Sequence, residues 1–264
     1  MSAFGTMLRD MRLANRFSQL DFSLESNVSS KHISFLETGR SKPSQEMVLH
    51  LARALGADLA GTNRLLSAAG YSQLFSRQDL SAPEMKMVKE ALDHMLISHM
   101  PYPAIVFDQN YYLIAGNSAQ MFLFQQLIAL GAKVGARPNV MLALLDEQGL
   151  KPFLEDWDNL ACHMLQRVHQ EHLAGPYRDQ NCELLDQALA LPGIPQDWKY
   201  RIVDGLDKPV VSFTIRLNDI RLNMFSTIAT IGTPLDITAQ NIRIEHFFPA
   251  DEDTKAYWHK HCAS

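Results

Sequence analysis

The first 70 residues have apolar positions that recur every three or four residues, the spacing of amphipathic helices. Five short helices are predicted there, and the two best defined cover residues 18–25 and 29–37. Ser18 and Ser29 stand at their starts as N-caps, because a serine oxygen accepts a hydrogen bond from a free N–H of the first turn. Gly39 follows the second helix, where the chain commonly turns left-handed. This segment, which we call the head, is therefore predicted to be all-helical.

Beyond residue 70 the pattern changes twice. Residues 71–100 form a connector that ends in a helix over 84–99, because Pro101 and Pro103 do not continue it. From residue 101 to 264, which we call the body, strand-like runs precede and follow a helical middle section. Predicted strands cover 104–107, 111–115, 210–217, 220–231 and 241–248, and predicted helices start at Asn117 or cover 155–173 and 182–191. Strands, then helices, then a run of antiparallel strands predict an α+β fold for the body.

Composition places the chain among ordinary globular proteins. Hydrophobic residues make up 47% and charged residues 20% of the 264 positions. The apolar runs fall far short of the about 20 residues that span a bilayer, so no membrane partner is predicted. Three widely separated cysteines exclude a disulfide framework, and charged residues from Arg9 onward leave no room for a secretory leader. These features predict a cytoplasmic protein.

Charge is distributed unevenly between the head and the rest of the chain. The net charge is −5, yet the head carries eight Lys and Arg against six Asp and Glu, whereas the remaining residues carry 16 against 23. A basic segment on an acidic body is the asymmetry expected when only that segment meets a polyanion. The imbalance is small, so it indicates a nucleic-acid partner only in combination with a motif.

Residues 17–44 carry such a motif, with the helix lengths and the turn of a helix-turn-helix. Its elements in chain order are Ser18-Gln19, Val28-Ser29, Ile33-Ser34, Leu36-Glu37, Gly39-Arg40 and Pro43-Ser44. The segment resembles the XRE (Cro/C1-type) family of regulators, and it departs from that pattern at Phe17, where many members carry a smaller aliphatic residue. The resemblance implies that double-stranded DNA is a partner and that residues 29–37 form the recognition helix.

A recognition helix presents the residues near its N-terminus to base edges in the major groove. Lys31 has the reach for guanine O6 and N7, and Arg40 and Lys42 suit phosphate contacts. The residues predicted to contact DNA are Gln19, Ser29, Ser30, Lys31, His32, Ser34, Arg40 and Lys42. The alternatives are that Lys31, His32 and Arg40 are solvated surface residues and that Ser29 is only a helix cap. Glu37 is predicted to be structural, paired with an arginine.

The body opens with a strand, a turn and a second strand over residues 102–117. This arrangement resembles the start of a PAS domain, and more closely the MmyB-like ligand-binding domain that follows an XRE head in many bacterial regulators. Residues 138–157, 225–238 and 244–254 carry the same resemblance, whereas Tyr111-Tyr112 departs from it, since many members have a tryptophan there. The resemblance implies a PAS-like fold and a lipophilic small-molecule effector, with fatty acids among the candidates.

A PAS-like sheet encloses a cavity between one of its faces and the covering helices, so apolar residues of the body are candidates for its lining. They are Ile105, Phe107, Tyr112, Ile114, Met121, Phe122, Phe213, Ile215, Phe225 and Ile228. Met and Phe suit an adaptable apolar pocket, and the alternative is that these residues simply fill a core. An acidic head group needs a partner, for which Arg201, Arg216, Arg221 and His163 are the candidates.

No catalytic residue, cofactor or metal site is predicted. The chain lacks a glycine-rich phosphate loop, a Gly-x-Ser-x-Gly elbow and an HExxH motif. His163, His169 and His172 share a predicted helix, but His169 faces away from His163 at a spacing of six residues.

The leading hypothesis is a ligand-responsive transcription regulator that binds a palindromic operator as a homodimer. A first alternative keeps DNA binding but limits the body to dimerisation or to contact with a protein partner. A second alternative is a small-molecule-binding or catalytic protein whose head no longer binds DNA.

Overall fold

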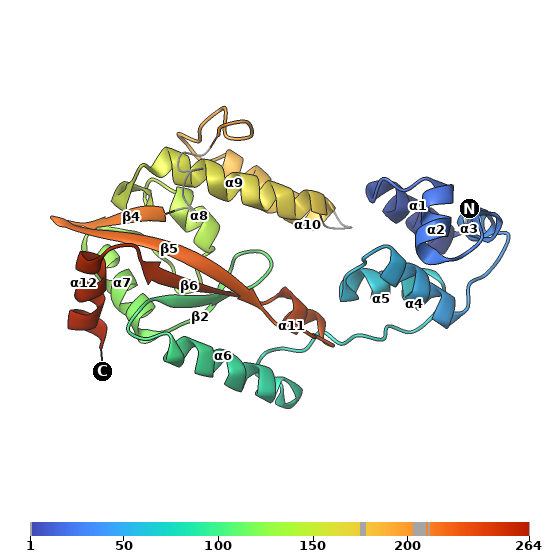
Figure 1. Ribbon diagram of the computed structural model, residues 1–264, viewed down its shortest axis with the longest axis horizontal. Coiled ribbons are helices and arrows are strands. Elements are labelled where there is room, and N and C mark those ends of the chain that lie inside the picture. Colours follow the sequence, from blue (N-terminus) through green and yellow to red (C-terminus); the bar gives the residue numbers. More distant parts are fainter. Residues whose placement is uncertain (1, 175–177, 203–209, 211, 264) are drawn as a thin grey trace. The chain divides into compact units, whose positions relative to one another are not determined.

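We describe the computed structural model of the protein over residues 2–174, 178–202, 210 and 212–263 (Figure 1). Contacts between residues divide the chain into two compact units. The first unit holds the chain up to Gln78 together with Thr233–Gln240, and most of the remaining chain forms the second unit. The predicted boundaries at residues 70 and 100 stay predictions, and in this division the connector helix belongs to the second unit.

Helices α1 to α5 of the first unit each begin at a side-chain N-cap. Their bounds are Ala3–Ala14, Gln19–Ser26, Ser30–Thr38, Gln45–Ala54 and Leu59–Ala68. Ser18 and Asp21 form a reciprocal capping box, which confirms the predicted start of α2. Asn27 ends α2 at φ 51° and Gly39 ends α3 at φ 78°, both in the left-handed region. The predicted helix-turn-helix is therefore present.

The core of the first unit forms where α1 crosses close to α3. A Cβ atom on Gly5 would lie 2.3 Å from the carbonyl oxygen of Glu37, so a larger residue there would push the two helices apart. Apolar side chains from all five helices surround this crossing and are fully buried: Leu8, Phe22, Ile33, Leu36, Val48, Leu51, Leu65 and Leu66. Each such burial contributes about 1.5–3 kcal/mol, which makes this cluster the main stabilising feature of the unit.

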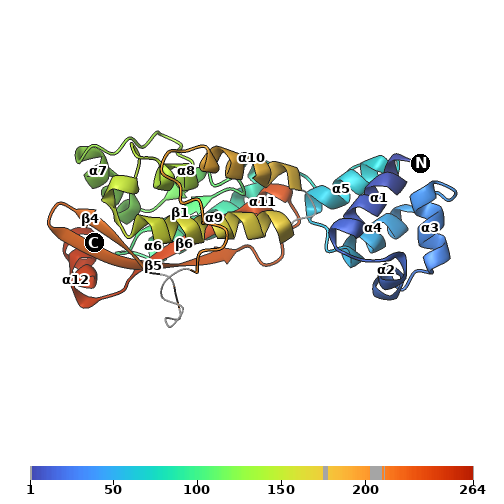
Figure 2. The ribbon, with the colours of Figure 1, turned by 90° about the horizontal axis from the view of Figure 1, so that it is seen from above.

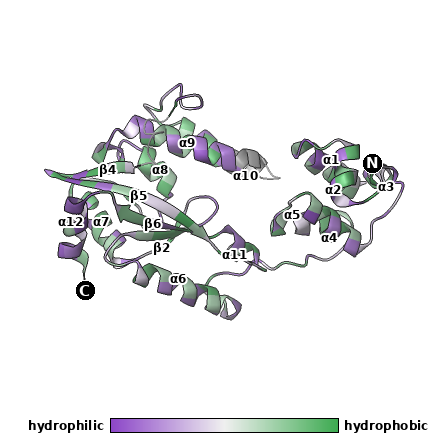
Figure 3. Cartoon of the chain, in the orientation of Figure 1, coloured by the Kyte–Doolittle hydropathy of each residue, from purple (hydrophilic) through white to green (hydrophobic). Residues whose placement is uncertain are grey.

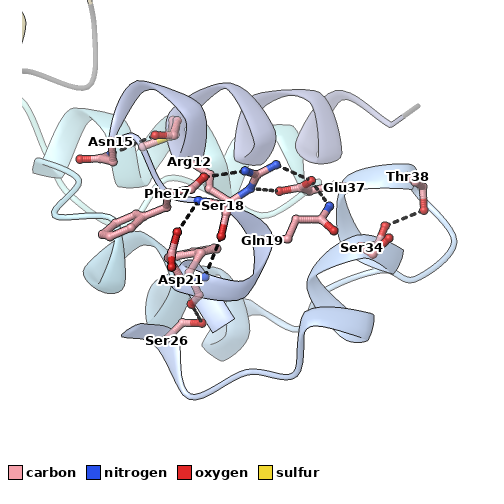
Figure 4. Close-up of polar contacts among 12 residues, drawn as sticks. Arg12, Asn15, Phe17, Ser18, Gln19, Asp21, Ser26, Ser34, Glu37 and Thr38 are labelled. Carbon is pink, nitrogen blue, oxygen red and sulfur yellow. Dashed lines mark hydrogen bonds and ion pairs between the residues drawn. The ribbon is translucent and has the colours of Figure 1, made fainter. Parts of the chain in front are cut away.

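A buried ion pair ties the N-terminal helices together (Figure 4). The Arg12 Nε donates to Glu37 Oε1 at 2.6 Å, and Arg12 Nη2 donates to Glu37 Oε2 at 3.1 Å. Arg12 also donates to the carbonyl of Phe17 at 2.7 Å, and the Gln19 amide donates to Glu37 Oε2 at 2.7 Å. Glu37 therefore joins α1, α2 and α3, and the prediction of a structural glutamate paired with an arginine is confirmed.

The second unit is built on an antiparallel sheet. Its strands are β1 (Ala104–Phe107), β2 (Leu113–Gly116), β3 (Leu154–Glu155), β4 (Ser212–Leu217), β5 (Ile220–Thr230) and β6 (Arg243–Pro249). The described strands pair in the order β2-β1-β6-β5-β4-β3, so the first and last strands of the body lie side by side in the middle. This curled sheet with its helices confirms the predicted combination of a helical N-terminal region and an α+β, PAS-like domain.

Helices cover both faces of this sheet (Figures 1 and 2). They are α6 (Lys86–Ser98), α7 (Ser118–Ala129), α8 (Val140–Leu145), α9 (Trp157–Ala174), α10 (Arg178–Leu189) and α12 (Glu252–Cys262), with short 3₁₀ turns at Pro83–Met85 and Lys151–Phe153. On one face α6 packs through Leu92 and Leu96, and on the other α8 and α9 pack over Ile105 and Phe107. Figure 3 shows α9 alternating between hydrophilic and hydrophobic segments, as expected of a helix with one buried side.

The connection between β5 and β6 packs within the first unit, where it includes most of helix α11 (Ile237–Asn241). The Asp236 carboxylate accepts from Ser76 Oγ at 2.7 Å and from the backbone N–H of Gln78 at 3.0 Å. The Gln240 side chain accepts from the backbone N–H of Leu59 at 2.9 Å. Two neighbouring strands of the sheet are therefore joined by a segment that completes the helical unit.

Substitution of Glu37 by alanine is expected to lower the stability of the first unit by about 3–5 kcal/mol, because it leaves the buried Arg12 guanidinium without its partner. Hydrogen exchange of the α1 and α3 amides measures this, since all three tryptophans lie outside the unit. Glu25→Ala, at an exposed position of α2, is the control and should change protection by less than about 0.5 kcal/mol. Unchanged protection in Glu37→Ala would show that the pair does not hold these helices.

Candidate functional sites: a recognition helix and an apolar cavity

The N-terminal half of α3 exposes the side chains that were predicted to meet DNA. Ser29 caps the helix, and its hydroxyl accepts from the backbone N–H of His32 at 3.3 Å. Ser30 and Lys31 are exposed and His32 is half-buried, whereas Ile33 and Leu36 point into the core. The cap that was proposed as the alternative role of Ser29 is present, and it leaves the hydroxyl at the exposed end of the helix.

The Phe35 ring on α3 contacts two cationic side chains. The Lys31 Nζ lies 5.8 Å from the centre of the Phe35 ring, and the Arg40 guanidinium carbon lies 5.9 Å from it. Both distances are within the range of a cation–π contact. Phe35 therefore brings the positive charge of Lys31 on the helix near that of Arg40 in the loop that follows. Lys42 is exposed in that same loop.

Gln19 and Ser34 are engaged within the first unit (Figure 4). The Gln19 amide nitrogen donates to Glu37, which fixes the side chain at the start of α2. The Ser34 carbonyl accepts from Thr38 Oγ1 at 2.7 Å, and its side chain is half-buried. Gln19 and Ser34 lie on or beside α3, and their DNA contacts stay predictions.

A cavity of about 430 Å³ lies inside the second unit, between one face of the sheet and the helices above it. This volume is within the range of small-molecule sites. Ile105, Phe213, Ile215 and Ile228 line it, as predicted from the sequence. Further apolar lining comes from β5, β6 and the helices, through residues that the sequence analysis did not select: Leu123, Phe124, Leu127, Leu160, Met164, Met224 and Phe247.

Three predicted lining residues near the first hairpin lie elsewhere. Phe107 is buried in the core and stacks on Tyr111, Tyr112 is 40% exposed, and Ile114 packs on the α6 side of the sheet. Phe107 shares the face of Ile105 but packs in the core cluster with Tyr111. For Ile114 the cause is the backbone, because the β1–β2 pairing shifts register between Val106 and Phe107 and passes over Ile114. A shift of one residue turns every following side chain to the opposite face.

Three more predicted lining residues lie outside the cavity, because their positions in the helix or strand repeat turn them to another face. Met121 is 47% exposed and Phe122 packs against Tyr257 and His261 of α12, because the cavity side of α7 carries Leu123 and Leu127 instead. Phe225 stacks on Phe248 on the face of β5 opposite to the cavity. Ligand contacts by these residues stay untested predictions, but the cavity does not include them.

The cavity has a polar end formed by α9 and the central strands. Its polar lining residues are Gln120, His163, Arg167, Ser226 and Glu245. The Ser226 hydroxyl donates to Glu245 Oε1 at 2.6 Å, and Arg167 Nε donates to the Tyr111 hydroxyl at 3.0 Å. Of the candidates for a head-group partner, only His163 lines the cavity. Arg201 pairs with Asp197 at 2.7 Å and Arg221 with Glu155, while Arg216 is exposed.

Burial shifts the ionisation of these groups. It raises the pKa of Glu245, and the nearby Arg167 opposes that shift. Burial, followed by repulsion from Arg167, lowers the pKa of His163, which favours the neutral form of this imidazole. Arg167 and Glu245 were not selected from the sequence, although an arginine at i+4 from a predicted pocket histidine on one helix is a usable signal.

Other kinds of site find no support within the described ranges. None of the described helices combines the length and apolarity that crossing a bilayer requires. In the same part of the chain, no three His, Cys, Asp or Glu side chains gather as a metal site.

Comparison with known protein families agrees with this division of roles. A family model for the MmyB-like transcription regulator ligand binding domain matches residues 88–259, and a helix-turn-helix family model matches residues 8–61. The search of curated proteins finds no match. The two family matches confirm the XRE-type head and the MmyB-like body predicted from the sequence. The chain therefore belongs to the transcription regulators that join a helix-turn-helix DNA-binding domain to an MmyB-like ligand-binding domain.

Proposed function

We propose that this regulator binds a palindromic operator as a homodimer and changes its DNA affinity when a lipophilic small molecule enters the body. Fatty acids are the first class to test. The observation that carries the proposal is one chain with both an exposed recognition helix and an apolar cavity with a buried polar end. A purely structural body needs no such cavity, so the combination favours a sensor.

DNA binding is assigned to the exposed residues of α3 and the loop after it. In this proposal Lys31 reads a base edge, and Arg40 and Lys42 neutralise phosphates. Ser29, Ser30, His32 and Ser34 supply shorter contacts, and Gln19 supports them from the start of α2. The cation–π contacts of Phe35 limit the freedom of Lys31 and Arg40 before DNA arrives, which reduces the entropy lost on binding.

Ligand entry is linked to the first unit through the chain itself. β5 and β6 supply Met224, Ser226, Ile228, Glu245 and Phe247 to the cavity, and the segment between these strands packs within the first unit. A ligand that binds one arrangement of the two strands better than another shifts the population of that arrangement. Coupling of about 1–3 kcal/mol, the usual range for such switches, changes operator affinity about 5- to 150-fold.

Alanine substitutions of Lys31 and Arg40 should act differently on DNA binding. Lys31→Ala should cost about 1–3 kcal/mol on the operator and relax base preference, whereas Arg40→Ala should weaken all sequences alike. Titration at several salt concentrations checks this, since loss of one phosphate contact lowers the salt slope by about one ion. Equal losses of Lys31→Ala on operator and random DNA would reduce that residue to a phosphate contact.

The ligand response is tested by operator affinity with and without a medium-chain fatty acid, together with native mass spectrometry of the purified protein. Wild type should bind the acid and change its operator affinity. Leu123→Trp, which fills the cavity, should abolish both effects, whereas Ile128→Trp, at a 49% exposed position of the same helix, should retain them. An unchanged operator affinity in saturated wild type would leave a DNA-binding protein whose body only dimerises or contacts a partner.

The dimer is tested separately by light scattering at micromolar concentration. One helix-turn-helix reads only a few base pairs, so two copies on half-sites about 34 Å apart are expected. A particle of twice the 29.8 kDa chain mass should appear without DNA, or that protein mass should remain after the mass of the operator DNA is subtracted from the complex. A single copy per operator would contradict the palindromic arrangement while leaving DNA binding intact.

A further inference from the structure

We propose that Arg167 and Glu245 form the head-group site of the cavity and bind a carboxylic acid with one proton shared between its carboxyl group and that of Glu245. The inference rests on the proposed ligand-sensing function and specifies the chemistry of its site. Arg167 supplies the charged donors, Glu245 selects for the acid form of the group, and the apolar lining holds the remainder of the molecule.

Glu245 lies in the middle of the sheet, where a carboxyl group is costly. It is 8% exposed on β6, and its cross-strand neighbours are Ile105 on β1 and Ile228 on β5. The hydroxyl of Ser226 donates to one of its oxygens at 2.6 Å. Within the described residues no second hydrogen bond or ion pair to this carboxyl group is formed. Burying an under-satisfied carboxyl group costs several kcal/mol, so the position points to a ligand that completes it.

The guanidinium of Arg167 is hydrogen-bonded through its Nε edge and presents its terminal nitrogens to the cavity. Its Nε donates to the Tyr111 hydroxyl at 3.0 Å and lies 3.7 Å from Glu171 Oε1. Tyr111 in turn donates to Glu171 Oε2 at 2.9 Å, which holds both partners in place. The two terminal nitrogens of Arg167 have no hydrogen-bond partner in the part of the chain that the structure describes. A guanidinium presents such a pair of donors in the geometry that matches a carboxylate.

Arg167 and Glu245 line the same cavity, but no ion pair of 4.0 Å or less joins them. The charge of each nevertheless shifts the pKa of the other. A group placed between them must accept from the guanidinium and donate to the glutamate. A carboxylic acid does both, because one oxygen faces Arg167 and the acidic proton bridges to Glu245. An ester of the same chain has no proton to donate, and an alcohol offers a weaker acceptor.

The charges around the site require the shared proton. Glu245 is faced by Arg167, Glu171 and His163 from α9 and by Ser226 from β5. Tyr111 of the first hairpin bonds to Arg167 and Glu171. One guanidinium already balances Glu171, so an ionised ligand beside an ionised Glu245 would place two unpaired carboxylates in a low-dielectric space. Binding of the ligand anion is therefore accompanied by one proton from solvent, and no covalent bond is made or broken.

The test compares dodecanoic acid with its methyl ester and with dodecanol, using calorimetry on the delipidated full-length protein. Titrations in buffers of different ionisation enthalpy count the protons taken up. The count is made above the pH at which Glu245 of the unliganded protein has lost its proton, a point that titration of wild type against Glu245→Gln locates. There wild type should take up close to one proton per dodecanoate. Its affinity for the acid should then fall about tenfold per pH unit as pH rises. Binding of the ester and of the alcohol should not change with pH.

Two variants separate the roles of the pair. Glu245→Gln carries a permanent amide donor, so dodecanoate should bind without proton uptake and with an affinity that no longer depends on pH. Arg167→Met should lose about 10- to 100-fold in affinity for the acid while binding the ester as wild type does. Arg201→Met, which removes an arginine that pairs with Asp197 outside the cavity, is the control and should change nothing. Unchanged ester binding shows that the cavity of each variant is intact.

The outcomes distinguish the two proposals. Equal binding of acid, ester and alcohol without proton uptake overturns the head-group site but leaves lipophilic sensing in place. Failure of all three probes to bind wild type overturns the proposed ligand class itself. Proton uptake that persists in Glu245→Gln would assign the proton to another group and would also contradict this inference.

Discussion

Alternation of side chains on the antiparallel sheet decides which residues line the cavity and which form the core. On β5, Met224, Ser226 and Ile228 face the cavity, while Phe225 lies on the opposite face. On β6, Glu245 faces the cavity, whereas its neighbour Ile244 packs on the α6 side. Because this period is two, a slip of β6 by one residue that brings Ile244 into the place of Glu245 would replace a carboxyl group at the cavity wall with an apolar side chain. The polar end therefore depends on backbone register before it depends on any side-chain contact.

The helical head could be predicted from sequence because its signals are local. The Ser18 capping box and the glycine after α3 each act within a few residues, so the local sequence is enough to predict where these helices begin and end. The partner of Glu37 was less accessible, since Arg12 lies 25 residues earlier and other arginines in the head were equal candidates by position. The local sequence pattern indicates that the buried Glu37 needs a cationic partner. Only the packing of α1 on α3 determines which arginine that partner is.

The cavity was harder to predict because strand phase and helix phase are set by distant contacts. Phe225 and Ile228 were both selected, yet residues three apart on one strand face opposite sides. The first hairpin shows a second limit: the shift in the β1–β2 pairing leaves Ile114 on the α6 side, and nothing in the sequence of this hairpin indicates such an irregularity. Arg167 and Glu245 were missed for a third reason, since they meet only when α9 is laid across β6. Buried charges of this kind lower stability, which is a common feature of functional sites.

The hydrogen bond between Ser76 and Asp236 joins residues 160 positions apart, and it has a consequence for the order in which the protein is assembled. At a synthesis rate of about 5–20 residues per second, Asp236 follows Ser76 from the ribosome by about 8–30 seconds. The helices up to α5 are complete long before then, but the N–H of Leu59 and the end of the first unit still lack the partners that Gln240 and Asp236 supply. The nascent DNA-binding unit therefore passes through a stage in which its helices are formed and its last segment is absent. The unit is complete only after β5 and the segment that follows it have been synthesised. The DNA-binding domain is therefore completed at the same stage of synthesis as the ligand-binding domain.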